Sequence, residues 1–100
     1  MKRFFNWLFN RTTVYNIITD KVGMVAILEL LYRDTDLTYE RAGLRKFDDK
    51  SVLMLKITGR NFKRLIDKLT WNLNGIELRN ISIYEKDSNV DLLEKRKMAA

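Results

Sequence analysis

The stretch from Thr19 to Leu31 most constrains the fold of this chain, because a strand pattern changes there into a helix pattern within one turn. Residues 12–19 are rich in β-branched and aromatic side chains, which is typical of a β-strand. Asp20 follows, and its carboxylate can accept hydrogen bonds from the free N–H groups that begin a helix. Gly23 lacks a Cβ, so the backbone of this turn can approach another group closely. The stretch therefore predicts a strand that leads directly into a helix.

The helix expected over residues 22–33 is apolar around most of its circumference. Val25, Leu28 and Leu31 share one face, and further apolar residues widen the arc. A helix of this kind is buried on more than one side. In a domain this small, the second contact points to another copy of the chain, so we predict a homodimer.

The middle of the chain predicts a β-hairpin. Residues 37–47 and 52–58 are strand-like, and residues 48–50 form a polar turn between them. Gly43 interrupts the imperfect alternation of the first strand, which is typical of a β-bulge.

A second helix and a last strand are expected after the hairpin. Between residues 62 and 73 the apolar side chains recur at spacings of three and four, which predicts an amphipathic helix. Asn61 can cap its start, and Asn74 followed by Gly75 can end it, with the glycine in the left-handed conformation. Residues 76–84 then predict the last strand.

The order is therefore strand, helix, strand, strand, helix, strand. Two βαβ-type halves give an α+β domain with a ferredoxin-like βαββαβ fold, in which a four-stranded antiparallel sheet carries two helices on one face. We expect three segments: an aromatic and basic N-terminal segment at residues 1–11, the domain at residues 12–86, and a charged C-terminal tail at residues 87–100.

The composition argues against an enzyme. The 100 residues contain no cysteine and no histidine, so the usual zinc sites and the Ser-His and Cys-His nucleophile pairs cannot be built. The acidic pairs Asp34/Asp36 and Asp48/Asp49 lie in predicted turns, where such residues are typical turn formers. We expect no catalytic residues, no metal site and no cofactor.

Two parts of the chain resemble ACT domains, which are small regulatory modules. Residues 18–25 (ITDKVGMV) are similar to the first strand, turn and helix of that family, although Val22 stands where the family usually has proline. Residues 62–69 (FKRLIDKL) and 73–76 (LNGI) resemble its second helix and the entry to its last strand. The resemblance covers roughly residues 13–85, and a domain of similar type ends some MgtC-like membrane proteins.

The resemblance implies a function for the first turn. ACT domains pair through sheets or helices and bind amino acids at the interface. The positions that correspond to the ligand-contacting turn are Asp20, Lys21, Val22, Gly23 and Met24. Asp20 would receive a ligand amino group, and the N–H groups around Gly23 and Met24 would hold a carboxylate. Capping by Asp20 alone also explains the pattern. The resemblance thus implies a dimeric, non-catalytic module that binds an amino-acid-like molecule or a protein partner.

The charge balance supports a rival function. The formal net charge is +6 at pH 7. On the second predicted helix, Arg64, Lys68 and Trp71 lie away from the apolar stripe, and such a basic and aromatic face can bind phosphates and stack a base. A small nucleic-acid-binding protein is therefore the alternative, although most charged faces are simply solvated.

The N-terminal segment suggests a further contact. Five large apolar residues fall within six positions, between basic residues on either side: Phe4, Phe5, Trp7, Leu8 and Phe9. Such a segment can lie in a membrane interface, on this domain's own sheet or on a partner protein. The sequence alone favours a protein contact. No small-residue cleavage pattern follows, so we expect a cytoplasmic protein, with peripheral membrane contact as the alternative.

Overall fold

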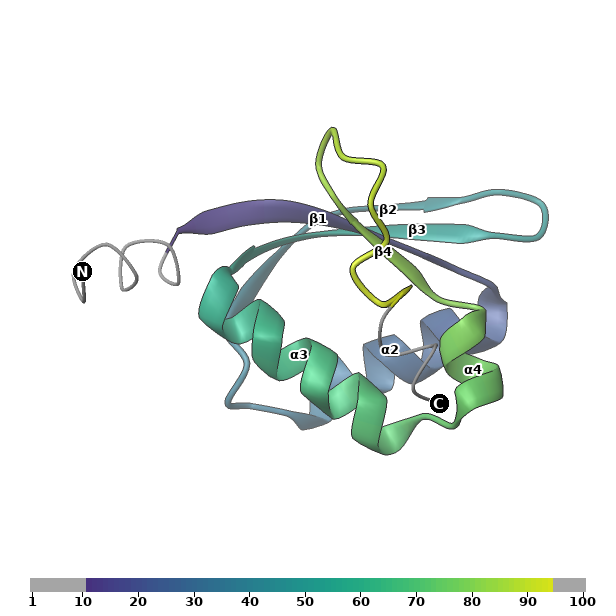
Figure 1. Cartoon of the computed structure of the whole chain (residues 1–100), viewed down its shortest axis with the longest axis horizontal. Helices are drawn as coiled ribbons and strands as arrows, with labels where there is room; N and C mark the ends of the chain where they lie inside the picture. The colour runs from purple at the N-terminus through teal and green to yellow at the C-terminus, as the bar shows by residue number, and fades with distance from the viewer. Residues whose placement is uncertain (1–10, 95–100) are drawn as a thin grey trace.

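A computed structural model describes residues 11–94 as an α+β fold with one four-stranded antiparallel sheet (Figure 1). The elements in chain order are β1 (Thr12–Thr19), α2 (Lys21–Arg33), β2 (Tyr39–Lys46), β3 (Ser51–Thr58), α3 (Gly59–Asn72), α4 (Gly75–Arg79) and β4 (Ser82–Glu85). The strand order is β2-β3-β1-β4, so β1 and β3 are the inner strands. The predicted fold class and antiparallel sheet are confirmed at this level.

The three helices lie on one face of the sheet (Figure 1). Alternate side chains of the inner strands point toward them, because successive residues of a strand face opposite sides. On β1 these are Tyr15, Ile17 and Thr19, and all are buried. On the opposite face, Val14 and Ile18 of the same strand are only half-buried. The core therefore lies between the sheet and the helix layer.

One aromatic pair joins the two layers near the start of β1. The rings of Tyr15 and Phe62 are stacked, with centroids 3.8 Å apart. Burial, and then the nearby Glu85 carboxylate, raise the pKa of the Tyr15 hydroxyl, while a hydrogen bond with Thr13 acts in the opposite direction. This stacked pair packs the inner strand β1 against α3.

The predicted hairpin and its bulge are confirmed. Strands β2 and β3 pair in register, with Tyr39 opposite Ile57 at one end. The register shifts between Arg41 and Gly43, so that Ala42 is the extra residue of a β-bulge.

The prediction for the cap of α3 was wrong. Thr58, the last residue of β3, is the N-cap, and its hydroxyl accepts a hydrogen bond from the backbone N–H of Asn61 at 3.3 Å. The side-chain amide of Asn61 instead donates to the carbonyl oxygen of Thr38 at 3.2 Å. A threonine at a strand end can cap as well as pair, and the sequence pattern did not separate the two roles.

The predicted end of α3 was also wrong, and the predicted last strand is confirmed only in its C-terminal part. Asn74 does not end α3 but begins α4, because its side-chain oxygen accepts a hydrogen bond from the N–H of Glu77 at 2.9 Å. Gly75 is helical and has no positive φ. The strand expected at residues 76–84 is thus shortened to β4, and the described chain has three helices where two were expected.

The packed unit continues beyond residue 86, where the predicted domain ends. Leu93 is completely buried in the core. The carboxylate of Asp91 accepts hydrogen bonds from the N–H groups of Ile83 and Leu93, at 3.1 and 3.0 Å, and the N–H of Leu92 donates to the carbonyl of Ile83 at 2.8 Å. Residues up to Glu94 therefore pack beside β4, although the charge of this region predicted a tail.

No helix among residues 11–94 has the length and apolar character needed to cross a bilayer.

The buried position of Leu93 leads to a prediction that uses its neighbour as a control. Leu93→Ala should lower the free energy of unfolding by about 2–5 kcal/mol, because it opens a cavity in the core. Leu92 is partly exposed, so Leu92→Ala should cost less than about 1 kcal/mol. Urea unfolding followed by circular dichroism measures both. Equal effects of the two substitutions would contradict the packing of this segment.

Candidate functional site

The turn between β1 and α2 caps the start of the helix at Asp20, as predicted. The carboxylate of Asp20 accepts a hydrogen bond from the N–H of Gly23 at 2.7 Å, and the N–H of Met24 donates to the carbonyl of Asp20 at 3.0 Å. The first N–H groups of a helix have no partner within the helix. After these two bonds, the N–H groups of Lys21 and Val22 remain at the positive end of the helix dipole.

Gly23 is explained by a close contact inside the protein. A Cβ added at this position would collide with the hydroxyl oxygen of Thr19. Thr19 is fully buried, and its hydroxyl has no hydrogen-bond partner within residues 11–94. The first turn of α2 therefore lies directly on the end of β1, and only glycine fits between them.

A hollow of about 390 Å³ lies between this turn and the closed end of the β2–β3 hairpin. Its size falls in the range of small-molecule sites, roughly 300–1,000 Å³. The lining residues are Asp20, Lys21 and Val22 from the turn, and Lys46, Phe47, Asp48, Asp49, Lys50 and Ser51 from the hairpin. The strand pairing explains the closeness of the two segments, because Thr19 pairs with Ser51 and Ser51 pairs with Lys46.

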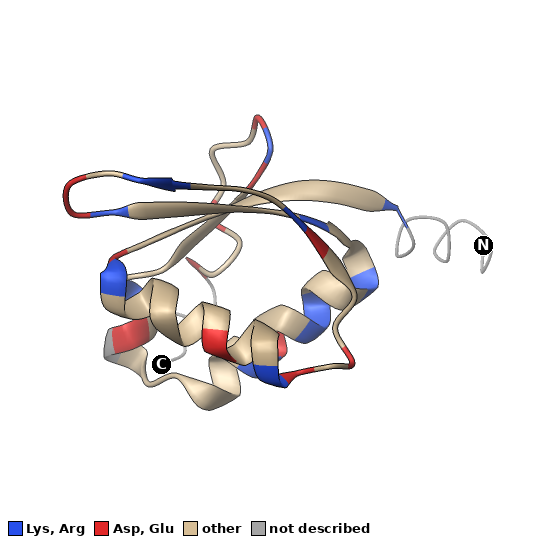
Figure 2. Cartoon of the chain, turned by 180° about the vertical axis from the view of Figure 1, so that it is seen from behind, with Lys and Arg blue, Asp and Glu red and all other residues tan. Residues whose placement is uncertain are grey.

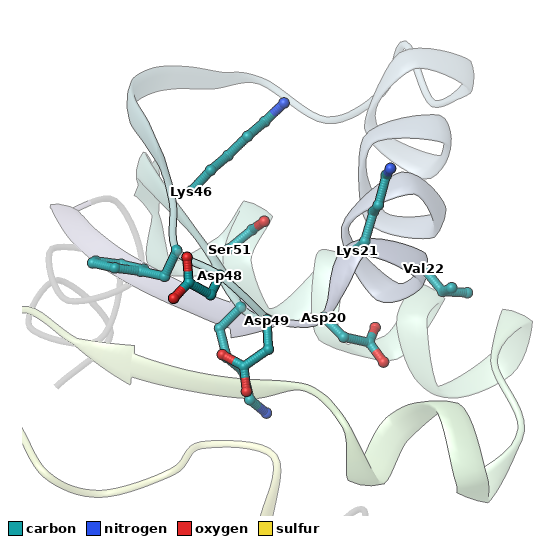
Figure 3. A pocket seen from close by; sticks show the side chains of 9 residues that line it. Asp20, Lys21, Val22, Lys46, Asp48, Asp49 and Ser51 are labelled. Carbon is teal, nitrogen blue, oxygen red and sulfur yellow. The ribbon is translucent and has the colours of Figure 1, made fainter.

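Both signs of charge line the hollow, and each wall contributes both: Asp20 and Lys21 from the turn, and Lys46, Asp48, Asp49 and Lys50 from the hairpin. Figure 3 shows the side chains of Lys21 and Lys46 extending in the same direction from the two walls. The carboxylates of Asp48 and Asp49 point the other way, from the hairpin turn. Positive and negative groups around one hollow suit a ligand that itself carries both charges, because each end of the ligand can meet its opposite.

The structure brings together only part of the predicted turn site. Asp20, Lys21 and Val22 line the hollow, whereas the side chain of Met24 is 5% exposed and belongs to the core. Gly23 is also buried and serves the close contact with β1.

The hairpin half of the hollow was missed. Asp48, Asp49 and Lys50 were interpreted only as a turn, and Lys46 only as part of the preceding strand. The predicted hairpin and the predicted sheet carried a usable signal, since pairing β1 with β3 places this turn beside Asp20.

The predicted basic face on α3 is partly occupied by an internal ion pair. The ammonium group of Lys68 pairs with the carboxylate of Asp34. Arg64 and Trp71 are exposed, with 84% of Trp71 accessible. Two of the three predicted residues are therefore open to a partner. The predicted contact residues at the N-terminus, Phe4, Phe5, Trp7, Leu8 and Phe9, lie outside the described residues.

Exposed apolar side chains form a strip along the outer side of α2. Val22, Val25 and Tyr32 are strongly exposed, with Tyr32 at 88%. The sequence predicted that another copy of the chain covers a second side of this helix, and that contact stays a prediction. A shallow groove along the strip also contains Glu29 and Arg33.

Within residues 11–94, no group of three or more acidic side chains is arranged to hold a metal ion. Comparison of the chain with models of known protein families, with curated proteins and with solved structures found no match. The ACT resemblance therefore stays a prediction from the sequence.

The contact between Gly23 and Thr19 can be tested by substitution. Gly23→Ala should lower the free energy of unfolding by about 1–3 kcal/mol, because the added methyl group overpacks a tight site. Gly43→Ala is the matched control, since a Cβ there meets only the end of the flexible Met54 side chain.

Removing the Thr19 hydroxyl should reduce the loss of unfolding free energy that Gly23→Ala causes. The double variant Thr19→Ala/Gly23→Ala should lose less stability than the sum of the two single changes, which a double-mutant cycle of urea unfolding measures. Strictly additive losses would show that the Thr19 side chain is not the reason why glycine is needed at position 23.

Proposed function

We propose that this chain is a non-catalytic regulatory and interaction module of ACT-like type, which binds a small zwitterionic molecule such as an amino acid in the hollow beside Asp20. The observation that carries the proposal is that one hollow of small-molecule size is lined by both lysines and aspartates. A ligand carboxylate would meet Lys21 and Lys46 together with the first N–H groups of α2, and a ligand ammonium group would meet Asp48 and Asp49.

The proposed fold is a variant of the ferredoxin-like βαββαβ arrangement with α4 inserted before the last strand. Support comes from the connections, because a helix follows each inner strand and the chain then returns to an edge strand. In this arrangement the turn after β1 and the hairpin turn share one end of the sheet. The fold thus supplies both halves of the proposed site.

A homodimer belongs to the same proposal, and the apolar strip on α2 is its proposed surface. Val22 belongs both to the strip and to the lining of the hollow, so pairing along α2 would bring a second copy next to the ligand. Glu29 and Arg33 beside the strip carry opposite charges. A two-fold interface brings the same patch from both copies, so a patch with both charges can be complementary to itself.

The nucleic-acid alternative receives less support. It relied on three residues of α3, and Lys68 is paired with Asp34. Arg64 and Trp71 alone give one cation and one ring, which is a small surface compared with a groove that follows a nucleic-acid backbone.

The ligand proposal is tested with the twenty standard amino acids as probes. At ten times its Kd, a ligand should stabilise the fold by about 1.4 kcal/mol and raise the Tm by about 5–10 °C. Lys21→Gln/Lys46→Gln should abolish that shift, whereas Lys63→Gln, on α3, should leave it intact. If no amino acid changes the Tm, or if the shift survives in Lys21→Gln/Lys46→Gln, the hollow is not the proposed site.

The dimer proposal is tested by light scattering over a range of concentrations. A dimer has twice the 11.9 kDa mass of the chain. Val25→Asp/Tyr32→Asp should weaken self-association by at least about tenfold, because charge replaces apolar contact area. Glu40→Gln/Arg45→Gln, on β2, is the control. A monomer at every concentration would refute the dimer without affecting the ligand proposal.

A further inference from the structure

The hollow beside α2 contains a buried hydroxyl group without a partner. Ser51, the first residue of β3, is 9% exposed and is the most buried of the residues that line the hollow. Figure 3 shows its hydroxyl group pointing into the space between Lys46 and Lys21. Within residues 11–94 this hydroxyl group forms no hydrogen bond. It is therefore free to bind a ligand.

A second unpaired hydroxyl group lies beside the first. Thr19 pairs in register with Ser51, and both side chains are buried under the helix layer. Directly opposite side chains on two antiparallel strands have Cβ atoms about 4.5–5.5 Å apart. Nearly all buried polar groups of native proteins have a partner, either in the protein or in a bound molecule. Two neighbouring hydroxyl groups without one therefore indicate a polar molecule at this end of the sheet, and Ser51 is the residue that it can reach from the hollow.

Other hydrogen-bond donors lie along the same hollow. The N–H groups of Lys21 and Val22 begin α2, at the positive end of the helix dipole. The ammonium groups of Lys21 and Lys46 extend from the two walls. Donors of this kind suit an oxyanion, which offers several lone pairs and no hydrogen. The Ser51 hydroxyl can add one more hydrogen bond to such a group.

The charges that line the hollow cancel. Aspartates and lysines each contribute three residues: Asp20, Asp48, Asp49, Lys21, Lys46 and Lys50. Figure 2 shows the acidic tip of the hairpin with basic residues on both of its strands. A site without net charge favours a ligand without net charge, because any excess charge on the ligand would stay uncompensated. A phosphate group, with a charge of about −1.5 to −2, therefore fits less well than the carboxylate of a zwitterion.

We propose that the hollow binds an amino acid with an uncharged side chain, and that the Ser51 hydroxyl group donates a hydrogen bond to the carboxylate of this ligand. The inference rests on the ligand hollow of the proposed function and narrows its class of ligand. The side chain of the ligand would meet Val22 and Phe47, which line the hollow, carry no charge and are strongly exposed.

Two simpler roles of Ser51 are less consistent with the structure. A serine that shapes the hairpin turn would bond to its backbone, but the turn is closed by a hydrogen bond from the N–H of Phe47 to the carbonyl of Lys50, at 2.7 Å. A residue that is needed only for its small size could equally be alanine, which buries no polar group. The unpaired hydroxyl group of Ser51 is explained by neither role.

The role of Ser51 is tested by isothermal titration calorimetry of the full chain with the uncharged standard amino acid that raises the Tm most. Ser51→Ala should weaken binding at least about tenfold, because a hydrogen bond to a charged group is lost. Without ligand, the Tm of this variant should be unchanged or higher, since no hydrogen bond within the protein is removed. Ser51→Cys keeps the shape with a weaker donor and should bind with intermediate affinity. Ser88→Ala, in the loop after β4 and outside the lining of the hollow, is the control and should bind with unchanged affinity.

The class of ligand is tested with glutamate, lysine and inorganic phosphate at the same concentrations. Each should bind at least about tenfold more weakly than the uncharged amino acid, because each brings an excess charge into the hollow. Equal affinity for glutamate or lysine would overturn the uncharged class. Tighter binding of phosphate would make the hollow a phosphate site and overturn the inference.

These measurements separate the inference from the proposed function. Unchanged affinity in Ser51→Ala, together with loss of binding in Lys21→Gln/Lys46→Gln, would overturn the role of Ser51 and leave the hollow as the ligand site. The absence of a response to every amino acid would overturn both.

Discussion

The fold depends on β1, which is bonded on both sides and buried on one face. It pairs with β3 along its whole length and with β4 over four residues. Its helix-facing residue Ile17 is completely buried, opposite the equally buried Leu53 and Ile83. Burial of each such side chain contributes about 1.5–3 kcal/mol to the free energy of unfolding. The neighbouring strands and the helix layer therefore depend on their contacts with this inner strand.

The close contact at the end of β1 determines where the candidate site forms. Because Gly23 lies directly on Thr19, α2 begins without an intervening loop and keeps its first N–H groups beside the hairpin turn. The hollow is thus a result of packing two backbones as tightly as glycine allows. Apart from Asp20, which caps α2, its charged side chains come from exposed positions, where substitution costs the fold little.

Local patterns in the sequence predicted most of the elements, because their signals depend on a few neighbouring residues. The cap at Asp20 and the bulge at Gly43 are both of this kind. The errors arose where one residue type serves two roles. Asn74 ends some helices and begins others, and only the packing of α4 decides between them. Leu93 was missed because its burial depends on the Asp91 hydrogen bonds, which connect residues eight positions apart. For the candidate site, the sequence predicted the turn but not its partner hairpin, since that proximity exists only in the folded sheet.

The position of β1 within the sheet also has a mechanical consequence. A tether attached ahead of Arg11 would pull along the axis of an inner strand, not on a loop or an edge. The load would fall on two antiparallel ladders at once, nearly parallel to the strand, so many hydrogen bonds would have to break together.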